Sequence, residues 1–237
     1  MNSNNEEICL AIDATNRWVL AGLYGPGVNE TFATDAPRES FRLLFPALRT
    51  MLDRHGVSRP DWIAAALGPG SFTGVRMGVG AARSLAQLWR IPVSGANSIH
   101  FYCYDLAART LRDEDVSVAV LLDGKQRRVY AGHAQTAALR AGRPGPEPRD
   151  IAPEEFLREL PPGTRVYADD PQAVASYCER SADEFAPLPA PSPAALCALT
   201  RNEPRVEWSA LRPLYLREDP AHAKYPRGMD HGSRTNS

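Results

Sequence analysis

Residues 68–76, Gly-Pro-Gly-Ser-Phe-Thr-Gly-Val-Arg, are the stretch of this chain whose residue types best suit chemistry, because its glycines and hydroxyls could bind an anion. An apolar run at 62–67 precedes them and a run of small residues at 75–89 follows, which predicts a strand, a loop and a helix. The N-terminus of such a helix offers free backbone N–H groups to a phosphate. The loop could instead be a tight turn in which Ser71 or Thr73 caps the helix, or could let another helix pack very close.

The spacing within this loop departs from the two common phosphate-binding patterns. A P-loop ends in Gly-Lys-Ser/Thr, whereas Val75 and Arg76 follow Gly74. A dinucleotide fingerprint needs Gly-x-Gly-x-x-Gly, and the third glycine here comes one residue late. The spacing therefore favours a capped turn that positions the helix, rather than an active site. The loop positions singled out are Gly68, Pro69, Gly70, Ser71, Phe72, Thr73, Gly74 and Arg76.

An aspartate that occurs twice in the same local pattern is the second candidate for chemistry. Residues 12–22 and 122–132 share Asp, Arg, Val, Ala and Gly at a constant offset, and each predicts a β-hairpin whose first strand ends in the aspartate. Such a duplicated hairpin resembles the start of each half of actin-like ATPases and sugar kinases, where the two turns face a phosphate chain. In the alternative, each aspartate only caps its own turn. The turn positions are Asp13, Thr15, Asp123 and Lys125.

Composition excludes several classes of protein. The chain has 237 residues with 43% hydrophobic and 23% charged residues, which is typical of a globular protein with one large or two small domains. The net charge of −1 argues against a free-standing nucleic-acid binder. Because no apolar run approaches the ~20 residues of a membrane span and no basic, apolar leader begins the chain, we expect a cytoplasmic protein without membrane association. Four scattered cysteines are expected to be reduced thiols: Cys9, Cys103, Cys178 and Cys197.

Strand and helix patterns alternate along the chain, which predicts largely parallel sheets covered by helices. With the duplicated hairpins, they predict an α/β fold of two related subdomains, each a mixed sheet with helices packed on it, the second smaller. The resemblance of the hairpins to actin-like ATPases implies that both subdomains are ribonuclease-H-like. The N-terminal subdomain is expected over 6–112, the C-terminal subdomain over 113–220, and a polar tail over 221–237. The expected helices cover 38–54, 74–89, 97–111, 153–160, 171–181 and 192–201.

Two of these helices carry more apolar or small surface than one core requires. Helix 38–54 has an apolar arc of roughly 200°, wider than the roughly 100° that a surface helix needs. Helix 74–89 is rich in glycine and alanine, which permits close packing. The extra faces of these two helices could be covered by another helix of this chain, such as 97–111, or by a second, similarly folded subunit. If a second subunit covers them, Leu48→Glu should abolish the complex of the two subunits. The predicted interface comprises Phe41, Leu44, Phe45, Leu48, Met51, Leu52, Gly74, Met77, Gly78, Ala81, Ser84, Leu85 and Leu88.

Enzymatic alternatives find less support. No Gly-x-Ser-x-Gly hydrolase motif surrounds Ser71. No two of the five histidines stand four residues apart, as the metallopeptidase motif requires. We therefore expect no catalytic residue and no metal. A nucleotide-binding ATPase or kinase is the better enzyme alternative, because the two aspartate turns fit it. Residues 170–220 lack the glycine-rich motif expected on the adenine side. Basic residues at Arg76, Arg83 and Arg90 could contribute to an RNA surface or simply be solvated.

The chain resembles a known family through pieces that span nearly its whole length. They are Ile12-Asp13-Ala14-Thr15, the 68–76 loop, Ile91-Pro92-Val93-Ser94-Gly95, the stretch from Leu122-Asp123 to Val129-Tyr130, and Pro213-Leu214-Tyr215-Leu216-Arg217. In this order they are similar to bacterial tRNA threonylcarbamoyladenosine biosynthesis proteins of the TsaB (YeaZ) type. The loop is highly specific, and the other pieces are weak singly. Two positions depart from the family: Ser40 stands where many members have histidine, and Gly124-Lys125 where Ala-Arg is usual.

The resemblance implies a role without chemistry of its own. Such proteins are degenerate members of the actin-like ATPase superfamily that pair with a related catalytic subunit, TsaD, which modifies the adenosine beside the anticodon of ANN-decoding tRNAs. A small ATPase, TsaE, joins the complex, and tRNA is bound only through the complex. The resemblance further implies a homodimer when the chain is alone. It implies no cofactor, except for a nucleotide that could be shared at the subunit boundary.

Overall fold

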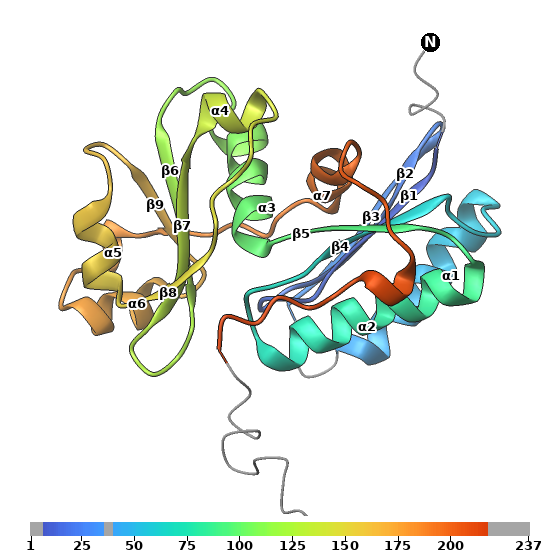
Figure 1. Cartoon of the computed structure of the whole chain (residues 1–237), viewed down its shortest axis with the longest axis horizontal. Helices are drawn as coiled ribbons and strands as arrows, with labels where there is room; N and C mark the ends of the chain where they lie inside the picture. The colour runs from blue at the N-terminus through green and yellow to red at the C-terminus, as the bar shows by residue number, and fades with distance from the viewer. Residues whose placement is uncertain (1–6, 36–39, 218–237) are drawn as a thin grey trace, which may run out of the picture.

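The computed structural model describes residues 7–35 and 40–217, and there the chain forms two lobes, each built on a five-stranded sheet (Figure 1). The lobe 1 sheet has the order β3-β2-β1-β4-β5, and the lobe 2 sheet has the order β10-β9-β6-β7-β8. The strands of lobe 1 are β1 (Cys9–Asp13), β2 (Val19–Gly25), β3 (Val28–Thr34), β4 (Trp62–Ala66) and β5 (Val93–Ala96). Those of lobe 2 are β6 (Ser117–Asp123), β7 (Val129–Gln135), β8 (Arg149–Ile151), β9 (Arg165–Ala168) and β10 (Ala186–Pro187).

The two sheets repeat one arrangement. In lobe 1, β1 pairs antiparallel with β2 and parallel with β4, and in lobe 2, β6 pairs antiparallel with β7 and parallel with β9. The first strand of each hairpin ends at an aspartate, Asp13 or Asp123. This confirms the predicted mixed α/β fold.

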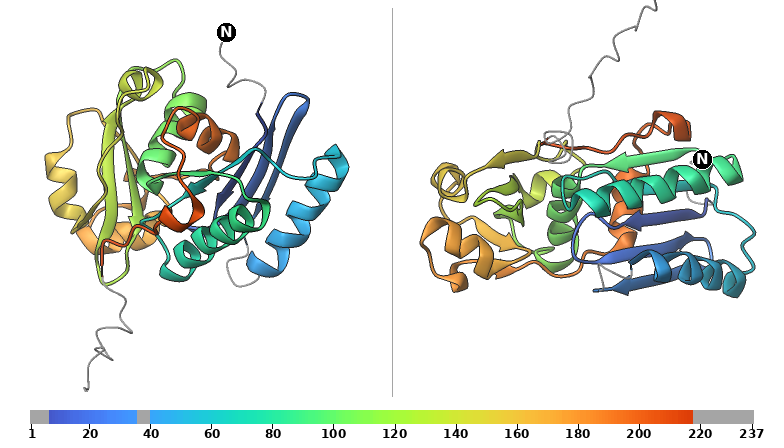
Figure 2. Two further views of the ribbon diagram at one scale, coloured as in Figure 1. Left: turned by 45° about the vertical axis from the view of Figure 1, so that its right-hand side comes forward. Right: turned by 90° about the horizontal axis from the view of Figure 1, so that it is seen from below.

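Two helices cover one face of the lobe 1 sheet (Figures 1 and 2), α1 (Ser40–His55) and α2 (Phe72–Trp89). The alternation of β1 explains how one strand serves two cores, since successive side chains of a strand point to opposite faces. Leu10 and Ile12 pack in the core under α1 and α2, whereas Cys9 and Ala11 pack in the core that faces lobe 2.

The second core lies between the lobes and contains α3 (Ser98–Asp105) and α7 (Pro193–Thr200) (Figure 1). Helix α3 packs on β6 and β7 and continues into the π-helical turn η2 (Leu106–Thr110). The remaining short helices belong to lobe 2 and to the connections: α4 (Thr136–Arg140), α5 (Pro153–Glu159), α6 (Pro171–Cys178), η3 (Ala182–Glu184) and η4 (Trp208–Ala210). Within the described residues, no helix is long and apolar enough to cross a membrane.

The end of the chain returns to lobe 1, which differs from the predicted subdomain of 113–220. Helix α7 packs on β1, β2, β4 and β5, and Val206 pairs with Val93 of β5. The physical reason is that Ala195, Leu196 and Cys197 of α7 are buried although they point in different directions around the helix, so α7 needs cover from more than one element. The predicted tail, 221–237, lies outside the described residues.

The return of α7 also corrects the expectation that all cysteines are reduced. Cys9 of β1 and Cys197 of α7 form a disulfide, with Cα atoms 6.3 Å apart, while Cys103 and Cys178 are free and buried. The two bonded residues are 188 positions apart in the sequence. They meet only because α7 crosses back to the sheet that contains β1.

Candidate functional site

A cleft of about 950 Å³ lies between the lobes and is the candidate site. Its walls come from segments that are far apart in the sequence: the two hairpin turns, the loop that precedes α2, the two aspartates that follow β9, and the end of the described chain. The structure therefore brings the glycine-rich loop and both aspartate turns together. The loop was predicted from its spacing to be a capped turn that positions the helix, and the structure places it in the cleft wall as well. The lining segments are 15–17, 69–73, 122–126, 169–170 and 214–217.

Asp13, at the end of β1, is buried, and both oxygens of its carboxylate accept hydrogen bonds from within the chain. Its Oδ1 accepts hydrogen bonds from the backbone N–H and the hydroxyl of Thr15, both at 2.8 Å, and its Oδ2 accepts one from the Tyr102 hydroxyl at 2.8 Å. Ser98 extends the network by donating to the Thr15 hydroxyl at 2.9 Å. Burial raises the pKa of Asp13. Asp13 thus stabilises its own turn, as the capping interpretation holds, and it does not line the cleft.

Asp123 occupies the equivalent place at the end of β6. Its carboxylate accepts from the backbone N–H of Lys125 at 2.8 Å and from the Tyr177 hydroxyl at 3.0 Å, and it forms an ion pair with the Lys125 ammonium group. Burial works to raise the pKa of Asp123, but these hydrogen bonds outweigh it and the pKa is lowered. The turn needs such bracing, because Lys125, Gln126 and Arg127 all have positive φ, which is unfavourable for residues other than glycine.

Asp169 is a site residue that sequence reasoning missed. It follows β9, and its Oδ1 accepts from the backbone N–H groups of Asp123, at 2.8 Å, and Asp170, at 2.9 Å. Burial and the nearby carboxylates of Asp123 and Asp170 raise the pKa of Asp169 to about 6. One signal could have identified it, because clefts in α/β sheets form at the carboxyl ends of parallel strands and β9 is parallel to β6.

We expect Asp169→Asn to stabilise the chain above pH 6 and to change little near pH 4. A raised folded-state pKa means that folding favours the protonated acid. The stability gained from protonation is therefore full below the unfolded pKa, ~3.9, and lost as pH rises through about 6. Asparagine keeps the accepting oxygen without the charge and should add about 1–2 kcal/mol at pH 8. Urea unfolding at pH 4, 6 and 8 measures the effect, and equal gains at every pH would contradict it.

The loop that precedes α2 lies directly against the first hairpin turn. Ser71 caps α2, with its Oγ accepting weakly from the Gly74 N–H at 3.4 Å, and the Ser71 N–H donates to the Thr15 carbonyl at 2.7 Å. A Cβ on Gly70 would lie 2.0 Å from the Thr15 carbonyl oxygen, and one on Gly74 would lie 2.0 Å from the Ala14 carbonyl oxygen. These glycines therefore allow α2 to contact the chain's own β1–β2 turn. This corrects the role predicted for Gly74, which was contact with another subunit.

Burial divides the predicted subunit interface into two groups. The buried members of the interface, Leu48 among them, form part of the core of lobe 1. Leu48→Glu would therefore disrupt the fold itself, and it is not a valid test of a complex. The buried members are Leu44, Leu48, Met51, Leu52, Gly78 and Ala81. The half-buried or exposed members are Phe45, Gly74, Met77, Ser84, Leu85 and Leu88. The side chains of Phe41 and of Ser40, the family departure, lie outside the described residues.

Charged groups around the cleft neutralise one another. Arg17 pairs with Asp35, Lys125 with Asp123, and Arg217 with Asp150. A phosphate would have to compete with these carboxylates for each cation. In the part of the chain that the structure describes, no group of three or more His, Cys, Asp or Glu is arranged to hold a metal ion.

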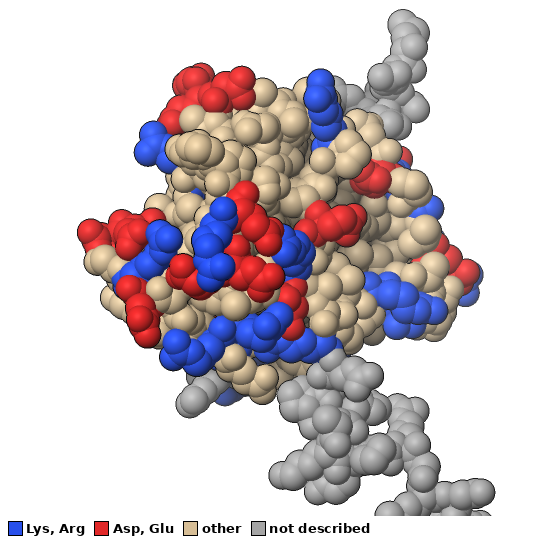
Figure 3. Space-filling model, turned by 60° about the vertical axis from the view of Figure 1, so that its left-hand side comes forward, with Lys and Arg blue, Asp and Glu red and all other residues tan. Residues whose placement is uncertain are grey.

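The face of the molecule in Figure 3 also mixes the two signs of charge. Acidic and basic side chains are interspersed over most of this face, and a row of basic side chains lies along its lower edge. Several are paired, including Arg149 with Glu159 and Arg180 with Glu184. A nucleic-acid surface is expected to be predominantly basic. Most of this face is therefore not predominantly basic, in contrast to an independent RNA-binding surface.

Comparison with known proteins identifies the class. Residues 24–157, more than half of the chain, match the family described as TsaD: tRNA N6-adenosine threonylcarbamoyltransferase, so the chain belongs to this family. Within the family the chain is of the TsaB/YeaZ type. The solved structure of YeaZ from Pseudomonas aeruginosa superposes with a TM-score of 0.68 at 24% identity, covering 89% of this chain and all of that one. A second, uncharacterized protein with similarity to peptidase YEAZ from Pseudomonas aeruginosa has the same TM-score at 26% identity.

Curated relatives match over shorter stretches. The tRNA threonylcarbamoyladenosine biosynthesis protein TsaB of Escherichia coli is 35% identical over 92 residues, which is 38% of this chain and 40% of the relative. TsaB of Bacillus subtilis is 31% identical over 126 residues, 52% of this chain and 53% of the relative. A tRNA N6-adenosine threonylcarbamoyltransferase of Corynebacterium diphtheriae is 31% identical over 112 residues, 46% of this chain and 29% of the relative. These matches span about half or less of each of these relatives.

Proposed function

We propose that the chain takes part in the biosynthesis of threonylcarbamoyladenosine in tRNA as a non-catalytic subunit. In this proposal it pairs with and activates TsaD, which transfers the threonylcarbamoyl group to the adenosine beside the anticodon of ANN-decoding tRNAs. The family match and the TsaB relatives support the pathway. The observation that supports a non-catalytic role is the state of the two turns, because the carboxylates of Asp13 and Asp123 accept hydrogen bonds from neighbouring groups of the chain itself.

The outer face of α2 is the surface that we propose for the partner. Thr73, Met77, Gly80, Ser84 and Leu88 recur at helical spacing on the part of α2 that is not buried by the sheet. Thr73, Gly80 and Ser84 have small side chains, and Met77 is half-buried. The Leu88 side chain, in contrast, is 73% exposed. A partner helix could therefore approach α2 closely and bury Leu88. The exposed part of α1, which includes Leu43 at 37%, continues this surface.

The remaining elements of the proposal follow from this pairing. The small ATPase TsaE joins the pair, and tRNA is bound through the combined surface of the complex, in keeping with the mixed charge of lobe 2. When the catalytic subunit is absent, a second copy of the chain covers the same face as a homodimer. The complex acts in the cytoplasm without a membrane. A nucleotide, if one takes part, is shared at the subunit boundary.

Reconstitution tests the proposal. Threonylcarbamoyl transfer to an ANN-decoding tRNA should require this chain together with TsaD and TsaE, and should fall to background when the chain is omitted. Transfer is measured as incorporation of labelled threonine into the tRNA. A catalytic subunit that turns over equally well without the chain would refute the proposed role.

The cleft supports one alternative, a nucleotide-binding ATPase or kinase of the actin-like type. Its volume of about 950 Å³ falls in the range of small-molecule sites, and both aspartate turns line it or lie behind it. Titration calorimetry of the isolated chain with ATP and Mg²⁺ separates the two functions. Stoichiometric binding followed by hydrolysis would favour the enzyme over the subunit.

A further inference from the structure

The end of the described chain crosses from one lobe to the other along the cleft. Leu211 is buried in the core of lobe 1, and the Leu214 N–H donates to the Leu67 carbonyl at 2.7 Å. The Tyr215 ring then stacks on Phe72 at the start of α2, with centroids 4.8 Å apart. Up to residue 215, the segment therefore lies on lobe 1 and follows the glycine-rich loop.

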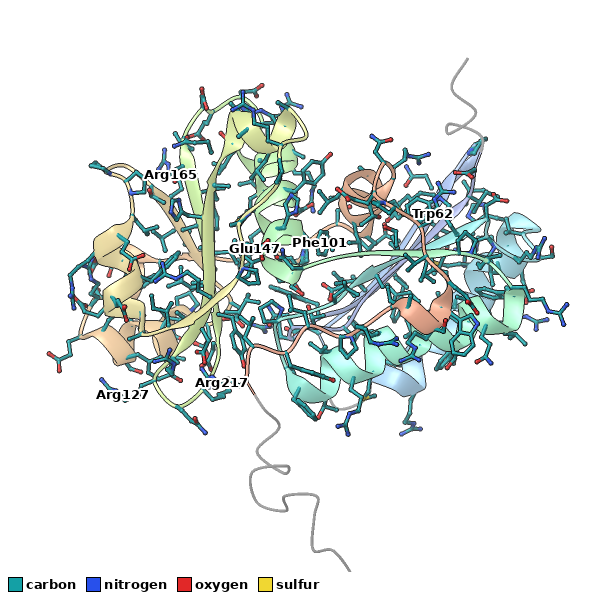
Figure 4. All side chains as sticks on the ribbon, viewed as in Figure 1. Trp62, Phe101, Arg127, Glu147, Arg165 and Arg217 are labelled. Atoms are coloured by element: carbon teal, nitrogen blue, oxygen red, sulfur yellow. A yellow bond between two sulfur atoms is a disulfide. The ribbon has the colours of Figure 1, made fainter. Side chains whose placement is uncertain are left out.

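Arg217 fixes the same segment to lobe 2, where Figure 4 labels it at the edge between the lobes. Its Nη2 donates to Asp150 Oδ1 at 2.6 Å, its Nε bonds to the other oxygen of that carboxylate, and its Nη1 donates to the Gly124 carbonyl at 2.8 Å. The guanidinium also lies 5.2 Å from the centre of the Tyr130 ring. A bidentate ion pair with an aromatic face beneath it is a strong and directional attachment.

Gly124 makes room for this attachment. A Cβ at this position would lie 2.9 Å from Arg217 Nη2 and 3.0 Å from the Arg128 carbonyl oxygen. The departure of this turn from the family pattern thus coincides with a close approach of the arginine to the turn backbone. The second aspartate turn therefore contacts Arg217 as well as its own aspartate.

This crossing differs from the other two places where the described chain passes between the lobes. The passage through α3 and η2 and the passage through residues 188–193 are both packed in the inter-lobe core, with Leu106 and Leu188 buried. Segment 211–217 crosses nearer the surface: beyond Leu214 it is attached by the Tyr215 ring stack and by Arg217, with Leu216 half-buried between them. It is therefore the crossing that can detach without unfolding either lobe.

We propose that residues 211–217 form a strap that fixes the angle between the lobes and covers the Asp123 side of the cleft, with Arg217 as its anchor on lobe 2. Because the anchor contacts Gly124 and Asp150, release of Arg217 would leave the inter-lobe core as the connection that holds lobe 2, and it would expose the second turn. The strap therefore sets whether that turn is accessible, independently of the proposed pathway role.

Distances between spin labels on the two lobes test the strap. Cysteines introduced at the exposed positions Thr50 on α1 and Gln172 on α6 take the labels, and the unsubstituted chain reports any labelling of its own thiols. Arg217→Ala should broaden the distance distribution and move it from the wild-type value, and Arg217→Lys, which keeps the charge without the bidentate geometry, should fall between the two. Arg212→Ala is the matched control, because Arg212 is exposed and, among residues 7–35 and 40–217, its hydrogen bonds go to the carbonyls of residues 209 and 211 on lobe 1.

Hydrogen exchange gives an independent measure on the same variants. The Leu214 amide should exchange about tenfold faster in Arg217→Ala, because a charge-assisted attachment has been lost. The Val206 amide, which bonds to Val93 on the lobe 1 side, should be unchanged and shows that the variant is folded. Distances and Leu214 exchange that match wild type in a folded Arg217→Ala protein would refute the strap.

Discussion

Gly74→Ala should destabilise the chain strongly, whereas Gly80→Ala, the same change two turns along the same helix, should stabilise it. A Cβ at Gly74 would lie 2.0 Å from the Ala14 carbonyl oxygen, and since that atom is backbone, the β1–β2 turn or the start of α2 must move. We expect a loss of about 2–4 kcal/mol of unfolding free energy. A Cβ at Gly80 meets nothing within 4 Å, so alanine there should add about 0.5–1 kcal/mol by its helix propensity.

Urea unfolding of the two variants beside wild type measures this difference. Gly74→Ala and Gly80→Ala make the same substitution in the same helix and add the same volume. They differ in whether another atom lies close to the added Cβ. Gly70→Ala extends the comparison, because its Cβ would lie 2.0 Å from the Thr15 carbonyl oxygen. Equal stabilities of the Gly74→Ala and Gly80→Ala proteins would contradict the assignment of the loop glycines to contact with the first turn.

The elements that recur in both lobes were predictable because their signals are local. Residues 12–22 and 122–132 each predicted a hairpin that ends its first strand in aspartate, and both hairpins form as expected. The helix after the glycine-rich loop begins at Phe72 and ends at Trp89, close to the predicted 74–89. Apolar periodicity and turn residues determine such elements without information from the rest of the chain.

The contacts between distant segments could not be derived in this way. The apolar arc of helix 38–54 correctly indicated that the helix has a buried face, but periodicity does not say what covers it. Leu48 is buried by the chain's own core, while Leu43 and Phe45 of the same arc are exposed. In the same way, the pairing of Cys9 with Cys197 depends on the return of α7 to lobe 1. Asp169 joined the site through the parallel register of β9 and β6, which the sequence alone did not determine.

Leu88→Glu should abolish the proposed complex with the catalytic subunit while leaving the isolated chain folded. Its side chain is 73% exposed, so a carboxylate there is solvated in the free chain and costs little stability. In the complex that carboxylate would be buried against a partner helix without a counter-charge. Loss of a central apolar contact together with this penalty should weaken binding about 100-fold or more.

Binding of each variant to the purified catalytic subunit, measured by calorimetry, decides the matter. Val206→Glu is the control, because Val206 is an exposed apolar residue beside β5 rather than on the outer face of α2. Ser84→Tyr adds a second condition: if the partner helix approaches the small side chains of α2 closely, bulk at this exposed position should weaken binding as well. Because both changes lie outside the core of lobe 1, unlike Leu48→Glu, a lost complex would report on the surface itself. Wild-type affinity in both Leu88→Glu and Ser84→Tyr would place the partner on another face.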